Sequence, residues 1–123
     1  MDSEELKRRT NFFALQVIRL IESLPPKQSV KIVGNQLLRS ATSVAANYRS
    51  ACKARSKADF VSKITIVEEE ADESQFWLEL MMEAGLVQES VVLPLYREAR
   101  ELTAIFTSSG KTAKQGLHRH KNS

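Results

Sequence analysis

Apolar residues recur along the first part of the chain at the spacing of an α-helix. Five of them, together with Thr10, fill the two core-facing sites of successive heptads: Leu6, Thr10, Phe13, Val17, Leu20 and Leu24. Such a stripe turns one face of a helix toward a core. Asp2 or Ser3 is suited to cap the start of this helix, and Pro25-Pro26 ends it because proline donates no backbone hydrogen bond.

Two further segments carry the same kind of stripe. The second helix is predicted on Leu37, Ala41, Val44, Tyr48 and Ala51, with Leu38, Ala45 and Cys52 beside them. The third is predicted on Phe60, Ile64, Val67, Ala71, Ser74, Leu78 and Met81. The sequence from Ser56 to Asp59 resembles a capping box at the start of the third helix, and Gly85 is suited to end it.

A fourth helix is predicted from about residue 91 to about residue 109, although Pro94 complicates its first turn. Its stripe is Val92, Leu95, Ala99, Leu102 and Phe106. Short connections make consecutive helices antiparallel neighbours, and no segment shows the alternation of a strand. We therefore expect an all-α protein, an antiparallel up-down-up-down four-helix bundle over residues 1–109, followed by a flexible basic tail over residues 110–123.

The first helix has more apolar residues than one core needs. Phe12, Leu15 and Ile18 lie off its main stripe. An additional apolar face predicts burial against another subunit, so a homo-oligomer is expected.

Charge divides the middle of the chain into two segments of opposite sign. Every charged residue from 28 to 58 is basic, whereas those from 59 to 85 are acidic apart from Lys63. Reflection about the turn near Ser56 sets Arg39 opposite Glu73, with Glu70 close by. We expect a partly buried polar network, whose loss would be strongly destabilising if the site is truly buried. Its members are Arg39, Ser43, Asn47, Glu70 and Glu73.

Several function classes find no support in the sequence. There is no Gly-rich phosphate loop and no Gly-x-Ser-x-Gly motif, and the only histidines, His118 and His120, lie in the tail. We expect no catalytic residue, no metal, no cofactor and no enzyme activity. The single Cys52 is expected to be a small core residue. No membrane span is predicted, and the acidic N-terminus is unlike a secretory signal, so a cytoplasmic location is expected.

Three motifs resemble those of one protein family. They are Gln36-Leu-Leu-Arg-Ser-Ala-Thr-Ser-Val-Ala-Ala-Asn, Ala54-Arg-Ser-Lys-Ala-Asp-Phe and Glu70-Ala-Asp-Glu-Ser-Gln-Phe-Trp-Leu. The chain thereby resembles the bacterial four-helix bundle proteins named for reading frames in 23S ribosomal RNA intervening sequences. The resemblance implies a ring-shaped homopentamer in which the polar positions Arg39, Ser43, Asn47, Glu70 and Glu73 serve fold and assembly. It extends to the accessory protein of diversity-generating retroelements, a similar pentamer that binds nucleic acid and a reverse transcriptase.

The charge distribution leads to one main functional hypothesis. The chain has a net charge of +3, and its basic residues are clustered. We expect binding to RNA or DNA through phosphate contacts. The candidate residues are Lys7, Arg8, Arg9, Arg49, Lys53, Arg55 and Lys57. In the tail, Lys111, Lys114, Arg119 and Lys121 form either a phosphate-binding arm or a solvated terminus.

Two alternatives stay open at this point. The first is a protein-interaction scaffold that never contacts nucleic acid and docks a partner on acidic residues of the third helix. Those residues are Glu68, Glu69, Glu79 and Glu83. The second is a protein with no selected biochemical activity.

Overall fold

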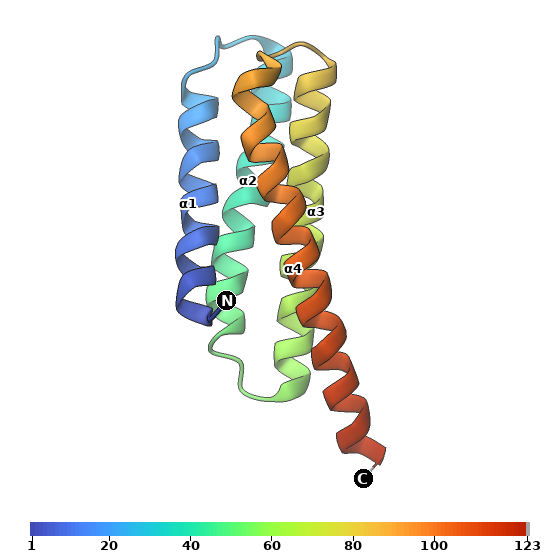
Figure 1. The fold of residues 1–123 in the computed structure, drawn as a ribbon. Helices are drawn as coiled ribbons and strands as arrows, with labels where there is room; N and C mark the ends of the chain where they lie inside the picture. Colours follow the sequence, from blue (N-terminus) through green and yellow to red (C-terminus); the bar gives the residue numbers. More distant parts are fainter. Residues whose placement is uncertain (123) are drawn as a thin grey trace.

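The computed structural model describes the backbone of residues 1–122 and the side chains of residues 1–118. It contains four antiparallel helices: α1 (Ser3–Glu22), α2 (Gln28–Ala51), α3 (Lys57–Glu83) and α4 (Glu89–Asn122). Each helix packs on the next in sequence, and α4 closes the bundle against α1 (Figure 1). Residues 1–122 include no strand, so the predicted four-helix bundle is confirmed.

The helix ends follow the local signals in the sequence. The Asp2 carboxylate accepts a hydrogen bond from the Glu5 backbone N–H at 2.8 Å, and the Ser56 hydroxyl accepts one from the Asp59 N–H at 3.0 Å. At the end of α3, Gly85 has a φ of 66°, and the Leu86 N–H reaches back to the Met81 carbonyl at 3.1 Å. This is the Schellman arrangement that glycine favours.

The predicted stripes meet in one core. Its largest fully buried side chains include Phe13, Val17, Leu37, Val44, Ile64, Val67, Leu78, Met81, Val92, Leu102 and Phe106. Several predicted members are only partly buried because they lie at the margins of this cluster: Leu24, Leu38, Cys52, Phe60 and Leu95.

Small residues occupy the contact between α2 and α3. Ser40, Ala41, Ala71 and Ser74 are all fully buried. The Ser74 hydroxyl donates to the Ser40 hydroxyl at 2.9 Å, which fixes the register of the two helices. Because these side chains are short, the two helix backbones can approach closely.

The fourth helix is longer than predicted. It begins at Glu89, contains Pro94 and continues to Asn122, past the end of the bundle (Figure 1). The predicted end near Ser109 is wrong because Gly110 does not act as a helix cap. It is a buried packing residue of α4, and a Cβ built there would lie 3.6 Å from Cγ2 of Ile64. The flexibility of residues 110–123 stays a prediction, and the side chains of Arg119 and Lys121 lie outside the described residues.

Two glycine-to-alanine substitutions should have different effects on stability. Gly85→Ala should lower the free energy of unfolding by about 1–2 kcal/mol, because an L-residue at φ 66° is strained. Gly116→Ala should not lower it, since Gly116 is helical and a Cβ there meets nothing within 4 Å. Urea denaturation of both variants measures the difference, and equal losses would contradict this assignment of the two glycines.

Candidate nucleic-acid interface

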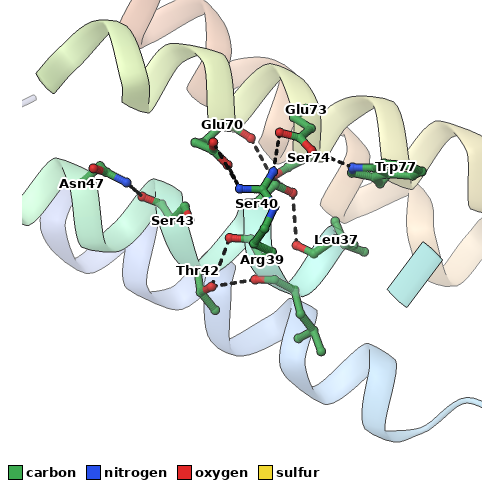
Figure 2. A network of polar contacts seen from close by, with 11 residues as sticks. Leu37, Arg39, Ser40, Thr42, Ser43, Asn47, Glu70, Glu73, Ser74 and Trp77 are labelled. Carbon is green, nitrogen blue, oxygen red and sulfur yellow. Dashed lines mark hydrogen bonds and ion pairs between the residues drawn. The ribbon is translucent and has the colours of Figure 1, made fainter. Parts of the chain in front are cut away.

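Arg39 joins α2 to α3, as predicted. Its guanidinium donates to Glu73 Oε2 at 2.6 Å and to Glu70 Oε2 at 3.2 Å (Figure 2). The Trp77 indole N–H donates to the other oxygen of Glu73 at 3.2 Å. The antiparallel register inferred from the turn near Ser56 is therefore correct.

Two predicted members of this network lie apart from it. The Asn47 amide donates to the backbone carbonyl of Ser43 at 2.9 Å, one turn away in the same helix (Figure 2). The four-residue spacing from Arg39 to Ser43 and Asn47 puts them on one face but too far along α2 to reach the carboxylates. The polar side chains that lie near Arg39 are instead Ser40 and Ser74, which are hydrogen-bonded to each other. Reflection about Ser56 pairs residue 40 with residue 72, two positions short of Ser74, so the turn alone indicates this pair only to within one helical turn.

The network lies at the surface, which corrects the expected burial. The side chain of Arg39 is 49% exposed, that of Glu73 32% and that of Glu70 17%. Water screens exposed ion pairs, and each stabilises a protein only slightly. The large destabilisation expected for a buried network therefore does not apply to this site. The ion pairs of Arg39 with Glu70 and Glu73 serve mainly to orient α2 against α3.

The hydrogen bond from Arg39 holds the pKa of the Glu73 carboxyl below its ordinary value of 4.5, and the Trp77 N–H acts in the same direction. A lowered folded-state pKa favours the folded protein at pH values above the unfolded-state pKa. This contribution disappears as the pH falls through the lower, folded-state pKa. Glu73 thus adds to stability at neutral pH and not in acid.

The remaining predicted cations gather at one end of the bundle. The start of α1, the end of α2 and the start of α3 share this end because the helices are antiparallel (Figure 1). We call it the basic pole, defined by Lys7, Arg8, Arg49, Lys53, Arg55 and Lys57.

Residues of the basic pole line two hollows. Lys7, Arg8 and Arg49 line a shallow depression of about 350 Å³. Arg55 and Lys57 line a groove of about 640 Å³ near the extension of α4. Residues more than forty positions apart in the sequence therefore meet on one surface.

Arg9 does not belong to this surface, which corrects the predicted set. Its guanidinium binds Glu98 through two hydrogen bonds of 2.8 and 2.7 Å, and it reaches Glu101 at 2.6 Å. The side chain is 24% exposed and joins α1 to α4. Its charge is already matched by two carboxylates. The spacing of Glu98 and Glu101, three residues apart on α4, was the overlooked signal.

The acidic residues of the alternative scaffold hypothesis do not form one uniform face. Glu69, Glu79 and Glu83 are exposed on α3. Glu68 is half-buried, and its carboxylate accepts a hydrogen bond from the Thr107 hydroxyl of α4 at 2.9 Å. One of the four carboxylates is therefore engaged within the bundle.

Two other kinds of site find no support within residues 1–122. In the part of the chain that the structure describes, no three His, Cys, Asp or Glu side chains are grouped so as to hold a metal ion. None of the described helices combines the length and the apolar character needed to cross a bilayer.

The dependence of Glu73 on Arg39 can be measured directly. In an NMR titration, the Glu73 carboxyl should titrate below pH 4.5, and Arg39→Gln should raise its pKa because the strongest donor is removed. The pKa of Asp59 is lowered by the Arg55 backbone N–H and Lys63, so it should stay unchanged in the variant and serves as an internal control. An unchanged Glu73 pKa in Arg39→Gln would contradict the assignment.

Comparison with known proteins places this bundle in a family. The family model described as 23S rRNA-intervening sequence protein matches residues 4–108. A crystal structure of a protein of unknown function from Bacteroides thetaiotaomicron, assigned to the S23 ribosomal protein family, is 31% identical and has a TM-score of 0.82. The similarity covers 90% of this chain and 99% of that chain. No curated protein matches the chain. The chain belongs to the 23S rRNA-intervening sequence protein family.

Proposed function

We propose that this protein is a non-enzymatic helical bundle that binds RNA or DNA through phosphate contacts at the basic pole. The supporting observation is that most basic side chains of the pole form no ion pair. Among the described side chains, Lys7 is the one residue of the basic pole in an ion pair, with Glu4 at 3.0 Å. None of the other five side chains forms an ion pair in the described part of the chain, although the charge of Arg55 acts on nearby Asp59. These cations can meet phosphates, which release counterions on binding.

We further propose that the protein acts as a homo-oligomer, a pentamer by its family resemblance. The side chains of Phe12, Leu15 and Ile18 are large, apolar and exposed on α1, and that of Phe12 is 57% exposed. A second copy would remove this surface from water. Assembly would also multiply a weak site, since avidity adds a factor of roughly 10²–10⁴ when the geometry permits simultaneous contact.

Salt dependence tests the phosphate contacts. The logarithm of the affinity for an RNA hairpin should fall linearly with the logarithm of salt concentration, and Arg49→Ala should reduce the slope by about 1 for each phosphate that the variant no longer neutralises. Lys31→Ala is the matched control, because Lys31 is exposed on the same helix at the opposite end of the bundle. Fluorescence anisotropy across a salt series provides the measurement.

The two arginines adjacent in sequence provide a second comparison within the same experiment. Arg8→Ala should weaken RNA binding, whereas Arg9→Ala should leave binding nearly unchanged and lower the melting temperature instead, because Arg9 holds α4. Absence of RNA binding at low salt, or equal effects of Lys31→Ala and Arg49→Ala, would overturn the proposal.

Assembly is tested by molar mass. Light scattering should give a multiple of the 13.9 kDa chain mass, and the double variant Phe12→Ser/Ile18→Ser should give a smaller mass. Ile32→Ser is the control, because Ile32 is 58% exposed on α2 and lies outside the α1 patch. A wild-type mass equal to one chain would refute assembly.

A further inference from the structure

The groove at the basic pole contains more than positive charge. Tyr48, Cys52 and Phe60 contribute aromatic and apolar surface to its lining, and Arg55 and Lys57 contribute the cations. On the opposite side, it is bounded by Ala113 and Gly116 of the α4 extension. Its volume of about 640 Å³ lies within the range of about 300–1,000 Å³ that is usual for small-molecule sites.

The path of α4 explains why the groove is open. Gly110, Ala113 and Gly116 recur every third residue on one face of this helix. At Gly110 the helix lies against α3, and a Cβ there would contact Ile64 and Glu68. At Gly116 a Cβ would meet nothing within 4 Å. Small residues thus face α3 at Gly110 and face the groove at Ala113 and Gly116. Their lack of bulk leaves the groove open beside the end of the bundle.

The electrostatics of the groove favour an anion. Its lining includes Arg55 and Lys57 and no Asp or Glu residue. The first turn of α3 opens onto it, because Ser56 and Lys57 belong to the lining, and a helix N-terminus carries partial positive charge. Asp59, a neighbouring carboxylate, is already bound by the Arg55 backbone N–H and by Lys63, each at 3.0 Å.

Acidic groups at the start of α1 do not reverse this preference. Burial raises the pKa of Tyr48, and its neighbour Cys52 and the charges of Asp2 and Glu4 add to the effect, so the phenol stays neutral at physiological pH. The Asp2 carboxylate caps α1, and the Glu4 carboxylate pairs with Lys7. Both acids are therefore engaged by partners of their own helix.

We propose that the groove holds one unpaired nucleotide of a single-stranded nucleic acid. The base lies against Phe60, which is only partly buried, and the adjoining phosphates lie near Arg55 and Lys57. Aromatic side chains accept any base by stacking, so this site adds preference for single strands without a preferred sequence. A base held in a duplex cannot enter the groove without being unpaired. The inference rests on the proposed function and adds the form of nucleic acid that is bound.

Gly116→Leu tests the inference, because Gly116 lines the groove and a Cβ there meets nothing within 4 Å, so the leucine side chain should take up part of the groove. The affinity for a short single-stranded RNA should fall about tenfold, the loss expected when a stacked base is expelled. The affinity for the duplex of the same sequence should change by less than about twofold, since its phosphate contacts are retained. Gln115→Leu is the matched control, because Gln115 is the adjacent exposed residue and does not line the groove.

Folding of the variant is verified separately. Leucine is a better helix former than glycine, so Gly116→Leu should retain its circular dichroism and melting temperature. Phe60→Leu keeps an apolar side chain and removes the aromatic ring. It should produce a similar loss for the single strand alone.

The outcomes separate the two proposals. If wild type binds single strand and duplex equally and Gly116→Leu changes neither, the groove inference fails while the proposed function stands. If wild type binds neither RNA, both fail. Vesicles containing an anionic lipid form a further arm of the experiment. Binding of wild type, but not Gly116→Leu, to these vesicles without binding to RNA would assign the groove to lipid and overturn the inference.

Discussion

The close contact of α2 with α3 sets the geometry on which the other features depend. Ser40 and Ser74 are buried and joined by their hydroxyls, and Ala41 and Ala71 on the same two helices are buried as well. Short side chains at this crossing let the two backbones approach. Among the side chains of residues 1–118, no buried nitrogen or oxygen lacks a hydrogen-bond partner. The antiparallel register of the two helices brings Arg39 to its two carboxylates. It also determines how the turn between the helices presents Arg55 and Lys57.

Much of this arrangement could be predicted from local signals. The heptad stripes identified the core, the capping residues Asp2 and Ser56 marked helix starts, and Gly85 marked a helix end. A short turn then fixed the partner of Arg39. These predictions succeed because spacing along a helix determines direction, and a short connection leaves two helices little freedom to slide past one another.

The errors arise where sequence spacing gives no information on distance from solvent or on closure of the bundle. The row of polar residues that contains Arg39 has the same spacing whether its side chains are buried or exposed to solvent. The spacing therefore could not predict how far the network is exposed. The contact of Arg9 with Glu98 joins residues 89 positions apart and depends on how α4 meets α1. Glycine is common at helix ends, but Gly110 is a packing residue inside α4. Only its contact with Ile64 on α3 distinguishes these two roles.

The unbroken course of α4 has a mechanical consequence. A helix resists bending more than a loop does, so a load on residues 111–118 is carried toward the bundle as a torque. The contacts of α4 with α3 that receive it include the packing of Gly110 near Ile64 and the Thr107 hydroxyl on Glu68. The projecting helix therefore behaves as a lever whose fulcrum lies on α3. A partner that binds residues 111–118 would therefore also act on the packing of α4 against α3.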